Sequence, residues 1–163
     1  MTLLLALTLA LVSAVPAFAA PAAPGFRVKL FDSPQTFDLR EMMGKKVVVL
    51  RFQASYCKPC VKESEAFSRL VDRYRGREVE FLALHVQDTT AEVKRFARDH
   101  RVNYALALDP KLTIGNRYGA KRTPYTVVID RKGEIAARLA GESAVARLPR
   151  VLDDALRRGP AKP

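Results

Sequence analysis

Three short apolar runs mark the centre of the chain. They cover residues 47–52 (VVVLRF), 79–86 (VEFLALHV) and 125–130 (YTVVID). Each run is nearly continuous and rich in β-branched residues, which is typical of strands that are covered on both faces of a sheet. The pattern therefore predicts three central strands in a buried sheet.

Weaker patterns predict four further strands and four helices between and around these runs. The shorter strands are expected at residues 28–31, 36–39, 104–108 and 135–139, and the helices at 58–74, 91–100, 114–118 and 143–158. The turn Ser33-Pro34 would join the first two strands into a hairpin, and Arg131-Lys132-Gly133 would join the last strand to YTVVID. Strands that alternate with helices predict an α/β fold, a three-layer α/β/α sandwich with a central mixed sheet and an N-terminal β-hairpin.

The first 19 residues have a different character. They contain no charged residue, and the apolar run from Leu3 to Val15 has about the length of a signal-peptide core, which is short for a membrane span. Ala17-Phe18-Ala19 matches a cleavage site, so we predict a signal peptide over 1–19 and an exported, periplasmic protein. Because no Lys or Arg precedes the run, an uncleaved membrane anchor and a buried helix remain alternatives.

The rest of the chain fits one folded unit. We expect a flexible linker over 20–25, a single domain over 26–158 and a tail over 159–163. A domain of roughly 130–140 residues buries enough apolar surface to fold without cross-links. The two cysteines of the chain are therefore not needed as a structural framework.

The net charge of +11 limits the classes of partner. The basic residues are spread along the chain and do not form a stripe interleaved with aromatic residues, so nucleic acid is not an expected partner. A solvated basic surface is the simplest interpretation. A docking face for an acidic partner, or association with an anionic membrane surface, remains open.

Cys57 and Cys60 stand where the first central strand gives way to a helix. The first-turn N–H groups of a helix lack internal partners and stabilise a thiolate. We expect Cys57 to lie exposed at the helix start and Cys60 to lie deeper on the same face, so that Cys57 attacks a disulfide and Cys60 resolves the mixed disulfide. Pro59 is tolerated in a first turn, and the charge of Lys58 favours the thiolate further.

Other uses of two cysteines fit less well. A zinc site needs four ligands, and the only histidines, His85 and His100, lack a suitable spacing. A structural disulfide across four residues would constrain little chain. We therefore predict no metal and no cofactor beyond the redox-active Cys57–Cys60 disulfide, while a Cu(I)-binding chaperone that uses both thiolates remains an alternative.

Thr123-Pro124 stands directly before the strand YTVVID. A proline in this position can simply mark a turn. Beside a Cys-x-x-Cys helix it has a sharper use, because a cis peptide bond would bring the backbone of Thr123 next to the attacking sulfur to pair with an extended substrate.

The segments VVVLRFQASYCKPCVKE, FLALHVQD and KRTPYTVVIDRKGEIAARLAG, in this order, resemble the TlpA/ResA-like branch of the thioredoxin superfamily. The resemblance extends from Phe26 to Leu156, and its most specific parts are the CxPC motif with Glu63 and the T-P-x-x-x-x-I-D-x-x-G run. It implies a thioredoxin-like fold and an exported thiol–disulfide oxidoreductase acting on protein thiols and disulfides. Such proteins are mostly reductases, for example in cytochrome c maturation, and a membrane thiol reductase supplies their electrons.

The resemblance also assigns roles to single residues. Cys57 would be the nucleophile, Cys60 the resolving thiol and Pro124 the cis-proline. Asp88 matches an acidic position that could tune the thiols or relay the proton of Cys60. Asp88 could instead cap the helix that follows it.

Several positions depart from the family pattern. Tyr56 replaces the usual Trp before the first cysteine, and Gln53 replaces an aromatic residue. Arg51 stands where Asn or a buried acid is common, and it must either turn outward or find a partner. These changes, together with the Lys-Pro pair inside the motif, leave a disulfide oxidase or isomerase as the alternative to a reductase.

Overall fold

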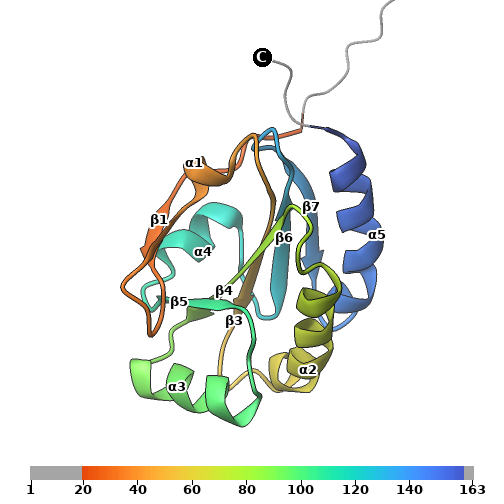
Figure 1. Ribbon diagram of the computed structural model, residues 1–163. Helices are drawn as coiled ribbons and strands as arrows, with labels where there is room; N and C mark the ends of the chain where they lie inside the picture. Colours follow the sequence, from red (N-terminus) through yellow and green to blue (C-terminus); the bar gives the residue numbers. More distant parts are fainter. Residues whose placement is uncertain (1–19, 160–163) are drawn as a thin grey trace, which may run out of the picture.

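The computed structural model describes residues 20–159 (Figure 1). The leader predicted over 1–19 and all but the first residue of the tail predicted over 159–163 lie outside these residues. Within 20–159, no helix combines the length and the apolar character needed to cross a membrane.

A five-stranded mixed sheet forms the centre of the domain (Figure 1). Its strands, in the spatial order β5–β4–β3–β6–β7, are β5 (Ala105–Asp109), β4 (Val79–Val86), β3 (Val47–Gln53), β6 (Tyr125–Ile129) and β7 (Ile135–Ala140). β3, β4 and β5 are parallel, β6 is antiparallel to β3, and β7 is antiparallel to β6. The three long apolar runs occupy the three inner positions, which confirms the prediction that they are covered on both faces.

Helices cover both faces of this sheet, as expected for a three-layer sandwich. One face carries α2 (Lys58–Arg73), α3 (Thr90–Asp99) and α5 (Ala144–Arg157), and the other carries α4 (Thr113–Tyr118). Alternate residues of β3 serve the two layers, since Val49 packs beneath α2 and α5 while Leu50 packs toward α4. Figure 1 shows α2 and α5 on one side of the sheet and α4 on the other.

The N-terminal hairpin lies beside α4. It consists of β1 (Arg27–Lys29) and β2 (Thr36–Asp38), which pair antiparallel in a separate two-stranded sheet. A short helix that the sequence did not predict, α1 (Leu39–Met42), follows directly and is capped by the Asp38 carboxylate, which accepts from the Arg40 N–H at 2.9 Å. One turn of helix is too short to show a 3.6-residue period.

The segment over residues 20–25, expected as a flexible linker, packs against the domain instead. The Ala23 N–H donates to the Gly133 carbonyl at 2.8 Å, and the Tyr118 hydroxyl donates to the Pro24 carbonyl at 2.6 Å. The Ala- and Pro-rich composition indicated only the absence of regular structure. The partners of this segment, the Gly133 carbonyl and the Tyr118 hydroxyl, come from distant parts of the chain, so the local sequence could not predict these contacts.

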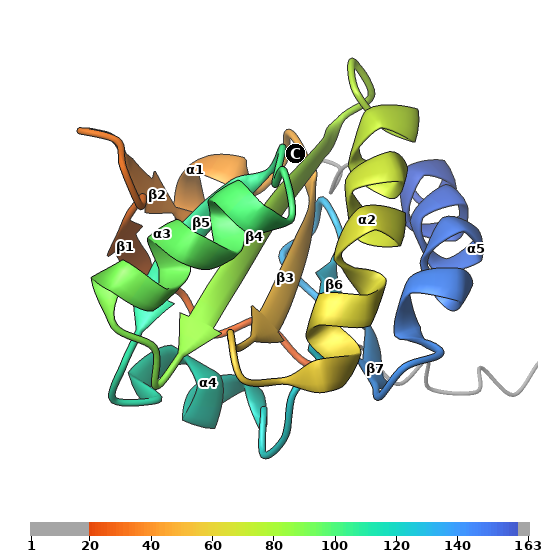
Figure 2. The ribbon, with the colours of Figure 1, turned by 90° about the horizontal axis from the view of Figure 1, so that it is seen from below.

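One end of the sheet collects the chemically interesting segments (Figure 2). β3 and β4 are parallel, so their carboxyl ends meet there, and the antiparallel β6 begins at the same end. The loop into α2, the loop into α3 and the segment before β6 are therefore neighbours. We refer to this as the disulfide end of the sheet.

Candidate active site

Cys57 and Cys60 form a disulfide at the start of α2. Cys57 is the N-cap residue, and its Sγ accepts the Cys60 N–H at 3.2 Å. Cys60 is completely buried and Cys57 is 6% exposed. The expectation of an openly exposed Cys57 is therefore wrong, because both residues join the apolar cluster on the α4 side of the sheet. Cys57 is still the only one of the two that a partner can reach.

The neighbours of the disulfide differ in exposure. Lys58 is the first residue of α2 and points to solvent, while Pro59 occupies the second position, where its missing N–H costs the helix no hydrogen bond. Tyr56 is 62% exposed, and its hydroxyl donates to Gln87 Oε1 at 3.3 Å. An aromatic side chain thus projects from the surface directly before the cysteine pair.

The Thr123–Pro124 peptide bond is cis. The register of the sheet pairs Phe52 with Tyr125, so Pro124, one residue earlier, lies opposite the point where the chain leaves β3 toward Cys57. Pro124 is buried, whereas Thr123 is partly exposed. The sheet therefore brings together two segments that are far apart in the sequence.

Arg51 is fully buried beneath α2 and is paired. Its Nη2 donates to Glu63 Oε2 at 2.8 Å, and its guanidinium lies over the Phe67 ring, 4.9 Å from the centroid. The sequence left open whether this arginine turns outward or finds a partner. The structure shows that the glutamate of the CxPC-x-x-E motif is the partner.

The Arg51 side chain starts a directional series of hydrogen bonds. Its Nε donates to Gln53 Oε1 at 3.2 Å, so the amide nitrogen of Gln53 faces His85 Nε2, at 2.8 Å. That ring nitrogen must accept, which leaves the proton on Nδ1, where it donates to Asp88 Oδ2 at 2.7 Å. The two contacts thus fix which ring nitrogen of His85 faces Gln53 and which faces Asp88.

Asp88 connects this series to the loop that precedes Cys57. Its carboxylate accepts the Ser55 N–H at 2.7 Å and the Ser55 hydroxyl at 2.8 Å. Asp88 is not the helix cap considered from the sequence, because Thr89 caps α3 and forms a capping box with Glu92. We call the connected side chains the polar chain; its members are Glu63, Arg51, Gln53, His85, Asp88 and Ser55.

Sequence reasoning missed His85 and Ser55 as members of this site. A usable indication was present, because Arg51, Gln53 and His85 interrupt otherwise apolar strands at positions that a covered sheet buries. Their partners could not be named, since Gln53 and His85 meet only through the β3–β4 register.

Asp88 remains ionised to low pH in the folded protein. Burial is the largest single influence and acts to raise the pKa of Asp88, but the hydrogen bonds from His85 and Ser55 together hold that pKa below its usual value of 3.8. The folded state therefore favours the carboxylate.

We expect Asp88→Asn to lower the free energy of unfolding at neutral pH by about 1–3 kcal/mol, because a charged acceptor of three hydrogen bonds is lost. A lowered folded-state pKa means that the carboxylate stabilises the fold above its unfolded-state pKa, and that this contribution disappears as the pH falls through the folded-state value. Urea unfolding should thus show a constant gap between wild type and variant from about pH 7 to 5, closing below about pH 4.

The matched control is Asp72→Asn, which removes an exposed carboxylate of α2 that pairs with Arg75. It should change the free energy of unfolding by less than about 1 kcal/mol. A gap for Asp88→Asn that stays unchanged in acid would contradict the assignment of Asp88 as the ionised acceptor.

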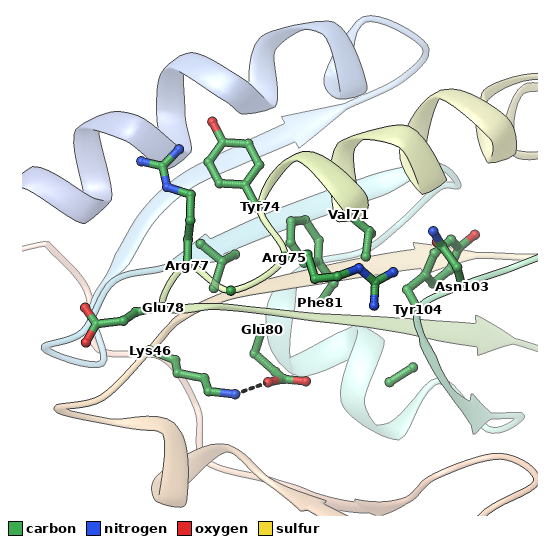
Figure 3. A pocket seen from close by; sticks show the side chains of 13 residues that line it. Lys46, Val71, Tyr74, Arg75, Arg77, Glu78, Glu80, Phe81, Asn103 and Tyr104 are labelled. Carbon is green, nitrogen blue, oxygen red and sulfur yellow. Dashed lines mark hydrogen bonds and ion pairs between the residues drawn. The ribbon is translucent and has the colours of Figure 1, made fainter.

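A pocket lies at the opposite end of α2 from the disulfide (Figure 3). It has a volume of about 550 Å³ and lies beside the last turn of α2 and the first residues of β4. Its charged side chains are paired with one another or with nearby residues: Lys46 with Glu80, Arg75 with Asp72, Arg77 with Asp153, and Glu78 with Arg131. This pocket is remote from the disulfide and is not part of the candidate site.

No group of three or more His, Cys, Asp or Glu side chains within residues 20–159 is placed to hold a metal ion. The polar chain contains one histidine and two carboxylates, but their donor atoms are turned toward each other in hydrogen bonds.

Comparisons with known proteins agree with this arrangement. A model of the AhpC/TSA family matches residues 15–138. The thiol-disulfide oxidoreductase ResA of Bacillus thuringiensis (strain Al Hakam) is 30% identical over 126 residues, which cover 77% of this chain and 72% of the relative.

Solved structures share the fold. A thiol:disulfide interchange protein of the thioredoxin family from Chlorobium tepidum matches with a TM-score of 0.74 and 20% identity, covering 84% of this chain and 97% of the other. A DsbF homologue from Corynebacterium diphtheriae matches with a TM-score of 0.74 and 23% identity, covering 86% of this chain and 90% of the other. These matches confirm the thioredoxin-like α/β fold with its N-terminal hairpin.

Proposed function

The chain belongs to the AhpC/TSA family and is a thiol–disulfide oxidoreductase, and from this premise we propose that it works as a disulfide reductase on exported proteins. The observation that supports this most directly is the Cys57–Cys60 pair at the start of α2, with only Cys57 reachable. The substrates would be proteins with accessible disulfides, in cytochrome c maturation or a similar pathway.

The proposed reaction has two steps. The reduced Cys57 thiolate attacks a substrate disulfide, a bond forms between Cys57 and one substrate sulfur, and the other substrate sulfur leaves as a thiolate that takes up a proton. Cys60 then attacks the Cys57 sulfur and releases the second substrate thiol. Two electrons pass to the substrate, and the protein ends as the Cys57–Cys60 disulfide.

The helix start and Lys58 stabilise the Cys57 thiolate, whereas the buried polar chain acts in the opposite, reducing direction, and we propose that the buried charge outweighs them. Strongly oxidising members of this fold stabilise their reduced, thiolate form. In the polar chain, however, the single guanidinium of Arg51 is set against two carboxylates, those of Glu63 and Asp88. A buried excess of negative charge opposes a nearby thiolate, so it favours the disulfide and gives the dithiol more reducing power.

The reduction potential tests this direction. We expect the Cys57–Cys60 couple to lie near that of thioredoxin, about −270 mV, rather than near that of DsbA, about −120 mV. The measurement equilibrates the protein with thiol buffers of known potential and counts free thiols by alkylation and mass. A value close to the oxidising end would overturn the reductase proposal and favour the oxidase or isomerase alternative.

We infer the compartment and the electron donor from the predicted leader. An exported reductase is cut off from cytoplasmic reductants, so a membrane thiol reductase would return two electrons to the pair after each turnover. The leader, if retained, would anchor the domain at the membrane. The basic surface would favour association with anionic lipid headgroups.

A further inference from the structure

Exposed cationic residues stand in the two segments that meet at the disulfide end of the sheet. Lys58 is exposed directly after Cys57, and Lys121 and Arg122 are exposed directly before the Thr123–Pro124 bond. These two groups approach the disulfide from different elements, the start of α2 and the segment ahead of β6. We call Lys58, Lys121 and Arg122 the basic rim.

The rim cations have no opposite charges of their own. Among the ion pairs of residues 20–159, Lys58, Lys121 and Arg122 take part in none. By contrast, the three cations that line the distant pocket of Figure 3, Lys46, Arg75 and Arg77, are all paired. The charge at the disulfide end is therefore free to meet a partner.

The carboxylates at this end of the sheet are already engaged. Three of them are engaged inside the fold: Glu63 pairs with Arg51, Asp88 accepts hydrogen bonds from His85 and Ser55, and Asp109 accepts from the first N–H groups of α4. Two are engaged nearer the surface: Glu92 accepts a hydrogen bond from Thr89, and Glu142 faces Lys62 at 4.0 Å. Glu63, Asp88 and Asp109 are also buried. The sequence mixes both signs of charge, but the fold buries three of these five acids, while Glu92 and Glu142 stay at the surface with partners of their own.

An aromatic side chain completes this surface. Tyr56 is the one large hydrophobic residue within 20–159 that is exposed, and it directly precedes Cys57 in the chain. Exposed aromatic residues with a polar tip are typical anchors of protein contacts. The surface around Cys57 thus offers one apolar anchor inside a field of positive charge.

We propose that the basic rim selects substrates whose reactive cysteine is flanked by aspartate or glutamate in an extended segment. This rests on the proposed disulfide exchange and adds its substrate class. Acidic flanks would meet Lys58 on one side of the sulfur, and Lys121 and Arg122 on the other. Complementary charge accelerates encounter and holds the register of the segment, while basic flanks are repelled.

The experiment compares homodimeric disulfides of matched short peptides that differ only in the residues beside cysteine, which are glutamate, glutamine or lysine. The reduced protein should reduce the glutamate peptide about tenfold faster than the lysine peptide at low ionic strength, with glutamine between them, and salt should narrow the difference. Quenching by alkylation and mass spectrometry gives the second-order rate constants.

Two charge-matched variants locate the effect. Lys121→Glu/Arg122→Glu should reverse the order of the peptides, and the milder Lys121→Gln/Arg122→Gln should make the rates nearly equal. The control Lys45→Glu/Lys132→Glu makes the same change in net charge at the far end of the sheet, where the Gly44 N–H donates to the Arg131 carbonyl, and should leave the order unchanged.

Neutral hydroxyethyl disulfide separates this inference from the proposed function. Each variant's peptide rates are divided by its own rate with this disulfide, which carries no charge for the rim to recognise, so that a change in the reactivity of Cys57 itself cancels. Equal rates for the three peptides, or an equal response to the control variant, would overturn the selection of acidic flanks while leaving the reductase intact. Failure to reduce any disulfide would instead refute the proposed function.

Discussion

Replacing Cys57 with serine should reduce disulfide reductase turnover by at least about 10³-fold, the scale on which loss of a nucleophile removes covalent catalysis. Cys57 is the only residue of the pair that a substrate can reach. Its sulfur accepts a hydrogen bond from the Cys60 N–H at the start of α2. Cys60 has no exposed surface and cannot take over the first attack. The measurement is the reduction of insulin by the reduced protein with excess dithiol as electron source.

Cys60→Ser separates the two steps. The variant keeps the attacking sulfur but lacks the resolving one, so it should accumulate a mixed disulfide with the substrate that denaturing mass spectrometry detects. The same trap should fail with Cys57→Ser. Insulin reduction that survives Cys57→Ser, or a mixed disulfide that forms through Cys60, would contradict the proposed order of attack.

The second large effect concerns the buried ion pair of Arg51 and Glu63. We expect Arg51→Leu to lower the free energy of unfolding by about 3–5 kcal/mol, because the Glu63 carboxylate is left buried without its partner. The substitution also removes the donor to Gln53 and the contact with the Phe67 ring. Urea unfolding of the oxidised protein at neutral pH gives the free energy directly.

The double variant Arg51→Leu/Glu63→Leu is the decisive comparison. With both charges gone, no unpaired ion remains, and stability should return to within about 2 kcal/mol of wild type. The partly exposed pair of Lys46 and Glu80 is the matched control, since Lys46→Ala should cost less than about 1 kcal/mol. Equal losses in the single and double variants would show that packing, and not the uncompensated charge, determines the cost.

The double variant also bears on the redox chemistry. It removes Glu63 and Arg51 together, so the carboxylate of Asp88 becomes the only charge left in the polar chain. If this buried charge opposes the thiolate as argued above, the reduction potential should move little in the double variant. In Arg51→Leu the excess of negative charge grows, and the couple should become more reducing.

Several features of the protein could be predicted from local sequence. The three apolar runs identified the inner strands because a strand covered on both faces must be apolar at nearly every position. The Cys57-Lys58-Pro59-Cys60 motif could be assigned to a helix start, because Pro59 fits the first turn of a helix and the preceding strand ends at Gln53. Its chemistry followed from that position.

Other features depended on strand register and long-range packing. The sequence presented Arg51, Gln53, His85 and Asp88 as separate anomalies, and only the pairing of β3 with β4 joins them into one polar chain. The near burial of Cys57 likewise depends on the apolar cluster contributed by distant segments. The hydrogen bonds that fix residues 20–25 come from Tyr118 and Gly133, which lie about a hundred positions further along the chain.

The sequence by itself determined the strands, every helix except α1 and the position of the redox-active pair, because these follow from periodicity and from the properties of a helix start, which act over a few residues. The tertiary structure alone decided which charges are buried and paired and which remain free around Cys57. Burial and pairing depend on contacts between residues far apart in the chain, and electrostatic interaction changes steeply with distance and solvent exposure. The disulfide therefore lies between a buried, paired set of charges beneath α2 and cations at the surface that are unpaired within residues 20–159.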